Sequence, residues 1–201
     1  MKINKENLKS LGRGVEKEVF ENPDNPDLTL GIYHEYKDES VNLIKARFYL
    51  TKILHMLSPE NMPDIHLVSS NPKLIVMDKV EGNDLVDEEK DWKKRQQEIK
   101  KLKDKFSNIG INILDDTPAN FRYDYNGNLV YLDNLYPWGQ SLRSSENKST
   151  VFYYDEKKLE AALKSLKEQG NRELGLSYLE RVEILRKEEF KNLSKAKSKN
   201  N

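Results

Sequence analysis

Three short segments near the middle of the chain carry residue types that could perform phosphoryl transfer. They are residues 115–120 (Asp-Asp-Thr-Pro-Ala-Asn), the pair Asn126-Gly127, and Asp133. In such chemistry one carboxylate orients the attacking hydroxyl, while an amide oxygen and a second carboxylate hold Mg²⁺ against the phosphates of ATP. The types and the order of these residues therefore predict a phosphoryl-transfer centre.

A β-hairpin is expected to bring two of these side chains together. Residues 121–125 and 128–132 are rich in aromatic and β-branched residues, and they are separated by Asn-Gly, a strong hairpin signal because both residues tolerate positive φ. Asn120 and Asp133 would then face each other at the open end of the ribbon. Asp115 precedes Asn120 across a turn that contains proline, which prevents a continuous helix. The spacing predicts a compact acidic pocket.

The same residues resemble the protein kinase-like superfamily, which includes protein kinases, aminoglycoside phosphotransferases and Rio-type atypical kinases. The catalytic loop of that superfamily reads H-R-D-x-x-x-x-N and is followed by a hairpin and D-F-G. Asp115, Pro118, Asn120 and Asp133 fall on matching positions. The resemblance implies that Asp115 is the catalytic base, that Asn120 and Asp133 bind Mg²⁺, and that ATP is the phosphoryl donor.

A segment near the N-terminus looks like a glycine-rich phosphate loop. Residues 11–20 read LGRGVEKEVF, with Gly12 and Gly14 in a Gly-x-Gly pattern and Val19 five positions after the second glycine. Lys17 stands where such loops have a third glycine. A lone Gly-x-Gly is weak by itself. The resemblance implies that Gly12, Gly14, Lys17 and Val19 contact ATP.

A second segment resembles the kinase hinge, the strand and linker that join the two lobes. Residues 73–85 begin with an apolar strand, continue with the bulky Met77 as gatekeeper, and end in an acidic residue and a glycine turn. The resemblance implies that adenine contacts Met77 and forms hydrogen bonds with the backbone of Asp78 and Val80. In all, the likeness covers roughly residues 8–135.

The chain also departs from the kinase pattern at the usual lysine and glutamate. The expected third strand, residues 28–34, offers only His34 near the place of the lysine, and Lys37 lies beyond the strand end. The following helix, residues 41–57, contains no acid, and Glu39 lies at its start. In addition, Ile113 replaces the catalytic-loop histidine, and Asn134-Leu135 replace Phe-Gly after the metal-binding aspartate.

An active enzyme of this type would need another cation at the phosphates. Lys17 is the best candidate because a side chain at that position of the loop could reach inward. The alternative is that it points into solvent, as lysine side chains usually do. The weaker candidates are Arg13, Arg47 and Lys37.

Each proposed site has a simpler explanation. Asp115 and Asp116 could be ordinary turn acids, and Asn120 could cap its own backbone, with Asp133 an ordinary loop residue. The two glycines could serve a plain tight turn. Met77 would be buried in an interior strand under any interpretation, and the charged helix around residues 93–105 fits a solvated face.

Composition excludes several classes of protein. The chain has 201 residues, 36% of them hydrophobic and 34% charged, with 34 Lys+Arg against 34 Asp+Glu and no cysteine. Bulk electrostatic binding of nucleic acid, disulfides and cysteine metal sites are therefore not expected. Because no apolar run reaches about 18 residues and the N-terminus lacks a signal-peptide pattern, we expect a cytoplasmic protein that does not contact membranes.

The fold class expected is α+β, with the two lobes of a protein kinase-like fold. Residues 1–80 would form an N-lobe with a small antiparallel sheet and one helix, residues 81–193 a reduced, mainly helical C-lobe, and residues 194–201 a disordered basic tail. Helices are expected at about 39–57 and 88–108, after Asp155, and from a capping box at Ser177 and Glu180.

Three functions are consistent with this pattern. The leading hypothesis is an ATP- and Mg²⁺-dependent phosphotransferase. The second is a catalytically inactive pseudokinase that binds nucleotide or protein, and the third is an unrelated interaction domain in which the motif spacing is accidental. The sequence leaves open whether the phosphoacceptor is a protein or a small molecule, and it leaves open the oligomeric state.

Overall fold

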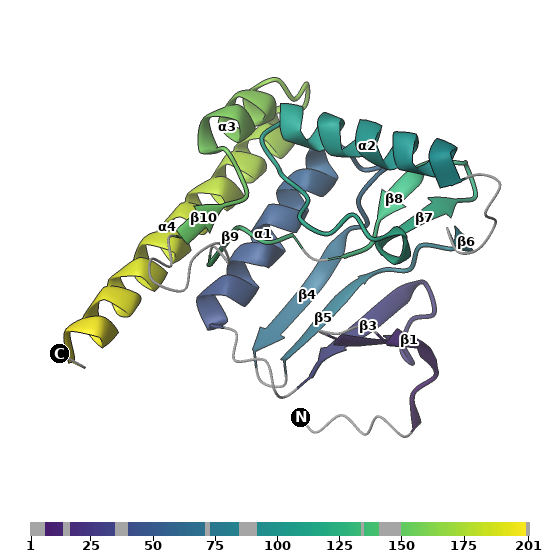
Figure 1. Ribbon diagram of the computed structural model, residues 1–201, viewed down its shortest axis with the longest axis horizontal. Helices are drawn as coiled ribbons and strands as arrows, with labels where there is room; N and C mark the ends of the chain where they lie inside the picture. The colour runs from purple at the N-terminus through teal and green to yellow at the C-terminus, as the bar shows by residue number, and fades with distance from the viewer. Residues whose placement is uncertain are drawn as a thin grey trace.

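The computed structural model shows an α+β protein (Figure 1). Within its described part, no helix is both long and apolar enough to cross a membrane. The structure describes residues 7–13, 17–34, 40–70, 73–84, 92–133, 135–140 and 150–199. Four residues of the sequence analysis lie outside these ranges, so the expectations for them stay predictions: Gly14, Lys37, Glu39 and Asn134.

A five-stranded antiparallel sheet forms the N-terminal part, as the sequence predicts. The turn at residues 22–27 joins its second and third strands, and the Asn22 and Asn25 side chains accept the N–H groups of Asp24 and Asp27, each at 3.0 Å. In sheet order the strands are β1 (Ser10–Arg13), β2 (Lys17–Glu21), β3 (Leu28–Tyr33), β5 (Lys73–Asp78) and β4 (Ile65–Ser70).

One helix, α1 (Val41–Leu57), follows β3 and confirms the predicted helix. It begins at Ser40, whose hydroxyl oxygen accepts the Leu43 N–H at 3.1 Å. Phe48 of α1 packs against the sheet residues Tyr33 and Ile75. The helix therefore covers the sheet face that carries these two side chains.

A smaller, three-stranded sheet contains the predicted hairpin. It consists of β6 (Gly82–Asp84), β7 (Phe121–Asp124) and β8 (Leu129–Tyr131), in that order. Gly127 has a φ of 81°, as the Asn-Gly turn requires. The Asp124 carboxylate also closes the turn, because it accepts the N–H groups of Asn126 at 2.9 Å and Asn128 at 2.7 Å.

Helix α2 (Trp92–Asn108) precedes the hairpin and ends before Gly110, whose φ is 96°. This confirms the predicted helix and its stop. Ile99, Leu102 and Phe106 form its buried stripe. The chain then reaches the short 3₁₀ turn η3 (Pro118–Asn120), which leads directly into β7.

The C-terminal part differs from the prediction at its last helix. After β9 (Trp138–Gln140) and β10 (Thr150–Phe152) come α3 (Glu156–Lys164), capped by Asp155 as predicted, and α4 (Gln169–Lys199). Ser177 does not cap a helix: it lies inside α4, and its hydroxyl donates to the Leu174 carbonyl at 2.7 Å. Residues 194–199, predicted to be a disordered tail, continue α4.

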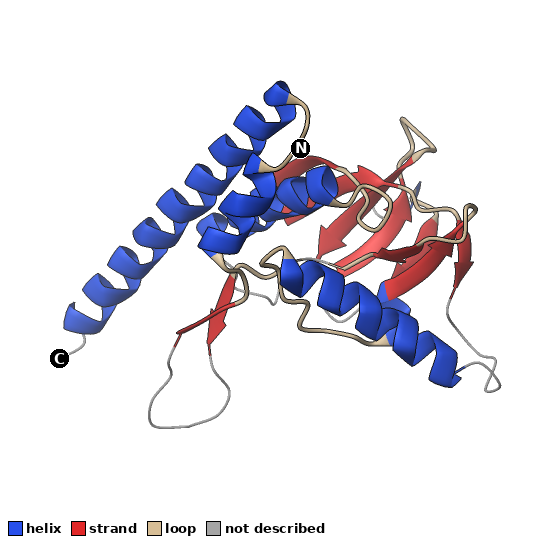
Figure 2. Ribbon diagram, turned by 90° about the horizontal axis from the view of Figure 1, so that it is seen from above, coloured by secondary structure: helices blue, strands red, loops and turns tan. Residues whose placement is uncertain are grey.

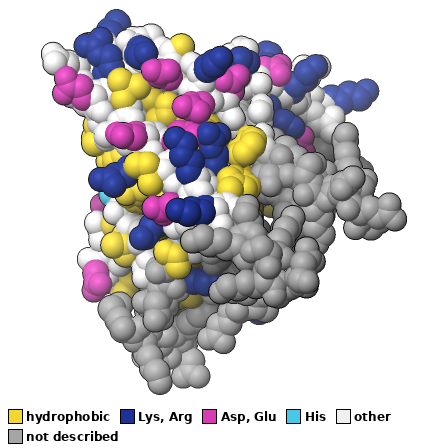
Figure 3. Space-filling view, turned by 90° about the vertical axis from the view of Figure 1, so that its left-hand side faces the viewer, with side chains coloured by type: hydrophobic (Ala, Val, Ile, Leu, Met, Phe, Trp, Pro, Cys, Tyr) yellow, Lys and Arg dark blue, Asp and Glu magenta, His cyan; other side chains and the backbone are white. Residues whose placement is uncertain are grey.

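On the side of the molecule where α4 lies, positive and negative side chains are mixed with apolar ones (Figure 3).

The main core joins α1 to the C-terminal helices. Ala46, Leu50 and Ile53 of α1 belong to the same buried cluster as Leu179 and Val182 of α4. Helix α4 runs beside α1 and packs against it more extensively than against any other described element (Figure 2). Helix α1, which belongs to the expected N-lobe, therefore shares its core with helices that lie far along the chain.

Asn61 links the loop after α1 to the smaller sheet and to α2 through a set of hydrogen bonds. Its side-chain Nδ2 donates to the Leu129 carbonyl at 2.8 Å, and its Oδ1 accepts from the Ser58 hydroxyl at 2.8 Å and the Lys105 ammonium at 2.6 Å. Its backbone carbonyl accepts the Tyr131 N–H at 2.9 Å. Asn61 thus connects the loop after α1 to β8 and to α2.

We expect Asn61→Ala to lower the free energy of unfolding by about 2–4 kcal/mol, because it removes the hydrogen bond to the Leu129 carbonyl and leaves the buried Ser58 hydroxyl with only a 3.5 Å contact to Glu60. Urea denaturation measures this loss. The control is Asn171→Ala, which removes a hydrogen bond to Glu168 on an exposed surface and should cost less than about 0.5 kcal/mol. Equal small losses in both variants would contradict the linking role of Asn61.

Candidate functional site

An ion pair joins the N-terminal sheet to the end of the hairpin. The Lys17 ammonium lies 3.1 Å from Oδ1 of Asp133, although the two residues are 116 positions apart in the sequence. Lys17 is only 9% exposed, so its side chain does not point into solvent. The structure therefore places the best candidate cation next to a predicted metal ligand.

The strand register explains how Lys17 reaches inward. Lys17 pairs with Tyr33 and Val19 pairs with Gly31 between β2 and β3, while Thr29 of β3 pairs with Met77 of β5. Cross-strand partners have their side chains on the same face of a sheet, and so does every second residue along one strand. Lys17, Val19 and Met77 therefore lie on one face of the sheet, as the resemblance to a nucleotide site implies.

Two residues of this face were missed by the sequence analysis. Tyr33, rather than His34, lies opposite Lys17 in the register. Gly31 lies beneath the Lys17 stem: a Cβ there would be 3.3 Å from Cδ of Lys17 and 2.7 Å from Cγ2 of Ile75. No sequence motif marks either residue, because their role depends on how β2 and β3 align.

Asn120 and Asp133 both lie at the open end of the hairpin, as predicted, but the residue opposite Asn120 is Leu132 and not Asp133. The Leu132 N–H donates to the Asn120 carbonyl at 2.8 Å, so Asp133 lies one residue further along the chain. The Asn120 Nδ2 is buried and faces the Asp115 carboxylate, whose pKa the amide helps to lower, although the contact falls short of good hydrogen-bond geometry. The amide nitrogen is a donor and therefore serves the Asp115 carboxylate, so only the amide oxygen of Asn120 could bind a cation.

Asp115 lies next to Asn120 in an exposed turn. Its Oδ1 accepts hydrogen bonds from the Thr117 hydroxyl and, at 2.9 Å, from the Thr117 N–H. The Thr117 hydroxyl bond lowers the pKa of Asp115 most; partial burial opposes this shift, while the Thr117 N–H and the Asn120 amide add to it. Asp115 is therefore a carboxylate at neutral pH. The next residue, Asp116, forms a surface ion pair with Lys103 at 2.6 Å.

The other candidate cations occupy different places. The Arg47 guanidinium of α1 is buried and stacks 3.8 Å from the centre of the Tyr136 ring, three residues after Asp133. Arg13 is exposed at the end of β1. Among the described candidates, Lys17 is the one that contacts Asp133.

The expected hinge residues form a linker between the two sheets. Met77 is buried, and its carbonyl accepts the Thr29 hydroxyl at 3.3 Å. Asp78 ends β5, and its carboxylate lies 2.6 Å from Nε2 of His66. The Val80 carbonyl accepts a hydrogen bond from Arg122 of β7 at 2.8 Å, which ties the linker to the smaller sheet. Gly12 lies in β1, with open space around its Cα.

The donor set fits Mg²⁺ only in part. Asn120 and Asp133 can offer one amide oxygen and one carboxylate, the oxygen ligands that Mg²⁺ prefers. In the ranges that the structure describes, no three His, Cys, Asp or Glu residues gather to hold a metal ion. A magnesium ion here would take its remaining ligands from phosphate oxygens and water, as is usual at nucleotide sites.

Comparisons with known proteins give this site no family context. No protein-family model matches the chain, and no curated protein matches it. The function is therefore inferred from the geometry of the site.

Proposed function

We propose that the chain is an ATP- and Mg²⁺-dependent phosphotransferase of the protein kinase-like type. The observation that carries the proposal is the contact between Lys17 and Asp133 at 3.1 Å. It brings a partly desolvated cation from the start of β2 to Asp133, the residue after Leu132, whose N–H donates to the Asn120 carbonyl. Such a set can bind a triphosphate and its metal ion.

The order of the elements also supports the proposal. The larger sheet has the order β1-β2-β3-β5-β4, with a single helix inserted between β3 and β4. A linker then leads into the part that carries Asp115, Asn120 and Asp133. A two-lobed kinase-like fold would have the same order of strands, helix, linker and acidic residues along the chain.

Each residue would then have a distinct role. Lys17 would bind phosphate oxygens, and Asn120 and Asp133 would hold Mg²⁺, which supplies charge neutralisation when bound. The oxygen of the acceptor hydroxyl would form a bond to the γ-phosphorus while the bond from that phosphorus to the β–γ bridging oxygen breaks. Asp115 would accept the proton that the hydroxyl loses. Because the pKa of Asp115 is lowered, Asp115 would mainly orient the hydroxyl and take the proton late.

A second function remains, in which the chain is an inactive pseudokinase that binds nucleotide or protein. The observation favouring it is that α1 presents Arg47, stacked on Tyr136, where an active kinase would hold its lysine with an acid. Lys17 instead uses Asp133 itself as its partner. Nucleotide binding without turnover would fit this arrangement.

Incubation with γ-labelled ATP, Mg²⁺ and a cell extract tests the proposal. We expect label to move to a protein or small molecule in the presence of the parent chain and much less with Asp115→Ala. Binding of ATP without transfer to any acceptor, to water or to the chain itself would favour the pseudokinase. Absence of ATP binding with any metal ion would favour an unrelated interaction domain.

Asp133→Asn is expected to abolish stabilisation by Mg·ATP. At a ligand concentration about 100-fold above Kd, the parent should melt about 5–10 °C higher than without ligand. The variant should show no such Mg²⁺-dependent shift, because it loses the charged metal ligand. Its melting temperature without ligand is measured separately, since the substitution also removes the ion pair with Lys17. Asp104→Asn on the exposed face of α2 is the control, and equal shifts in all three proteins would remove Asp133 from the site.

A further inference from the structure

A glycine lies under the side chain that joins the two parts of the proposed site. Gly31 is buried in the middle of β3, and a Cβ atom at this residue would lie 3.3 Å from Cδ of Lys17. A carbon–carbon distance of this size is closer than the optimal contact of about 3.5–4.0 Å. The stem of Lys17 therefore occupies space that a side chain at residue 31 would need.

The strand register explains this close approach. Lys17 of β2 pairs with Tyr33 of β3, and Gly31 comes two residues before Tyr33, on the same face of the sheet. Gly31 is therefore the diagonal neighbour of Lys17. The Lys17 ammonium lies 3.1 Å from Oδ1 of Asp133, and only 11% of the Lys17 side chain is exposed. The stem thus passes over Gly31 on its way from β2 to Asp133.

The backbone of β3 gives no other reason for a glycine at this position. Three described glycines have a positive φ, and Gly31 is not one of them. Strand β3 pairs with β2 and with β5 around residue 31 without a shift of register, so the strand has no bulge there. A glycine inside a regular strand weakens it. Space for a neighbouring group therefore explains Gly31 better than backbone conformation does.

Ile75 closes the opposite side of this space. It is the partner of Gly31 on β5, and its Cγ2 would lie 2.7 Å from the added Cβ. The Ile75 side chain is 3% exposed and belongs to a buried cluster with Tyr33 and Ile65. A packed, β-branched side chain has little freedom to move, whereas the unbranched stem of Lys17 can change rotamer. A methyl group at residue 31 would therefore be accommodated mainly by displacement of Lys17.

We propose that Gly31 is a positioning residue for Lys17. The lack of a side chain at residue 31 keeps open the path by which an ammonium carried on β2 reaches Asp133, while the β3 position opposite Lys17 is filled by the buried Tyr33. The place of the ammonium can be measured without nucleotide, whereas its role toward phosphates rests on the proposed function.

Acetylation rates of individual lysines test where the Lys17 ammonium lies. Acetic anhydride reacts slowly with a buried, ion-paired lysine, and mass spectrometry gives the extent of reaction at each lysine. In the parent we expect Lys17 to react at least about tenfold more slowly than the exposed Lys157, a factor that one charge-assisted contact can supply. Gly31→Ala should raise the rate at Lys17 about threefold or more, because it weakens that contact.

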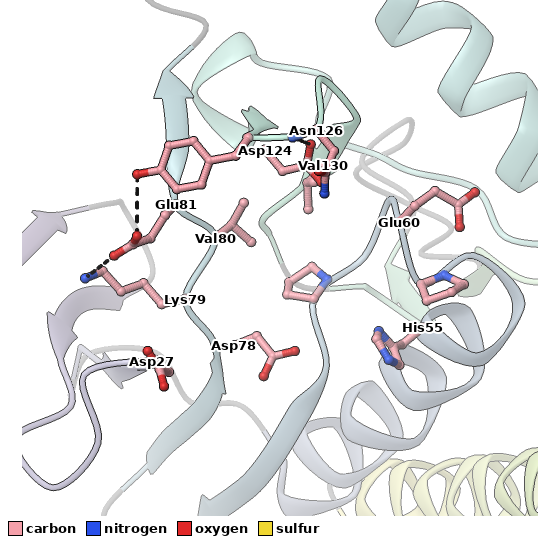
Figure 4. A pocket seen from close by; sticks show the side chains of 13 residues that line it. Asp27, His55, Glu60, Asp78, Lys79, Val80, Glu81, Asp124, Asn126 and Val130 are labelled. Atoms are coloured by element: carbon pink, nitrogen blue, oxygen red, sulfur yellow. Dashed lines mark hydrogen bonds and ion pairs between the residues drawn. The ribbon is translucent and has the colours of Figure 1, made fainter.

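Lys79 reports whether the substitution has loosened the sheet as a whole. It follows β5, its side chain is 20% exposed, and its ammonium lies 3.0 Å from the Glu81 carboxylate (Figure 4). Its rate should be the same in the parent and in Gly31→Ala. Gly170→Ala adds a methyl group where the described part of the chain leaves open space, so it should change neither rate.

A second pair of variants isolates the methyl group if Gly31→Ala does not fold. Ile75→Leu removes Cγ2 from its place in the core at little cost, because the change conserves volume. Gly31→Ala/Ile75→Leu then keeps the contact with Lys17 and relieves the one with Ile75. We expect Lys17 to react about threefold faster in this double variant than in Ile75→Leu alone.

Binding of Mg·ATP tests the consequence for the proposed function. Gly31→Ala should weaken binding about three- to tenfold in the parent and should have no further effect in Lys17→Ala, because the glycine acts through the lysine. Equal losses with and without Lys17 would overturn the positioning role.

Two acetylation results would also overturn it. One is an unchanged rate at Lys17 in both variants that carry Gly31→Ala, and the other is an equal rise at Lys17 and Lys79. If Gly31→Ala exposes Lys17 while the parent binds no Mg·ATP, the positioning role stands and the phosphotransferase proposal fails. The two proposals can therefore fail independently.

Discussion

Phosphoryl transfer by the Asp115→Ala variant is expected to fall by about two to four orders of magnitude, the usual effect of removing a general base. The affinity for Mg·ATP should change little, because in the proposed site Asp115 would contact the acceptor hydroxyl and not the nucleotide. Single-turnover transfer at saturating Mg·ATP measures the first quantity, and a binding titration measures the second. This split between chemistry and binding is what distinguishes a catalytic carboxylate from a turn-forming one.

Asp116→Ala is the matched control for that experiment. Asp116 is the neighbouring carboxylate, and it forms an exposed ion pair with Lys103, so its loss should change transfer by less than about threefold. Thr117→Val removes the hydroxyl that holds the pKa of Asp115 low, and it should raise that pKa. If Asp115→Ala and Asp116→Ala lose the same small amount of activity, Asp115 is a turn residue.

The lowered pKa of Asp115 also sets the expected pH dependence. A carboxyl group with a lowered pKa stays ionised as the pH falls and gains its proton only below its ordinary range. Transfer by the parent should therefore show no acid limb from Asp115 between about pH 5 and 8. An acid limb in this window that disappears in Asp115→Asn would contradict the lowered pKa of Asp115.

Local features of the site could be predicted from the sequence. The Asn126-Gly127 pair indicates its own turn, and the apolar spacing of α2 and the glycine at residue 110 mark that helix and its end. Such signals depend on residues a few positions apart. They were sufficient to place Asn120 and Asp133 at one end of a hairpin.

Long-range features could not be predicted in the same way. The contact between Lys17 and Asp133, and the position of Tyr33 opposite Lys17, depend on the register of β2 against β3 and on how the two sheets meet. The predicted start of the last helix at Ser177 was wrong. Ser177 resembles a capping residue in the sequence, but it lies inside α4, where its hydroxyl donates to the Leu174 carbonyl. The packing of α1 against α4 cannot be predicted from local sequence patterns either.

Lys17→Ala should weaken binding of Mg·ATP about ten- to a hundredfold, the loss expected for one charge-assisted contact in a partly buried site. Lys17 is the described cation that contacts Asp133, so phosphates bound beside Asp133 would meet its charge. Calorimetric titration measures the change. Lys157→Ala, which removes an exposed lysine of α3, should bind as the parent does.

Tyr33→Lys in the Lys17→Ala background provides a rescue. Cross-strand partners lie about 5 Å apart, so a lysine at residue 33 would present its ammonium near the place of the lost one. Partial recovery of Mg·ATP affinity would support a requirement for charge at this point. If Lys17→Ala, Arg13→Ala and Arg47→Ala all bind nucleotide as the parent does, no compensating cation exists and the inactive binding module becomes the better interpretation.

The most direct test of the site is chemical labelling of the lysine beside the phosphates. An acyl phosphate of ATP transfers its acyl group to an amine that lies next to the bound phosphate chain, and mass spectrometry identifies the labelled residue. The proposed site predicts that Lys17 is labelled far above exposed lysines such as Lys157, and that excess Mg·ATP prevents the labelling. Labelling of Lys17 no stronger than that of Lys157, with no protection by Mg·ATP, would contradict a nucleotide site at the Lys17–Asp133 pair.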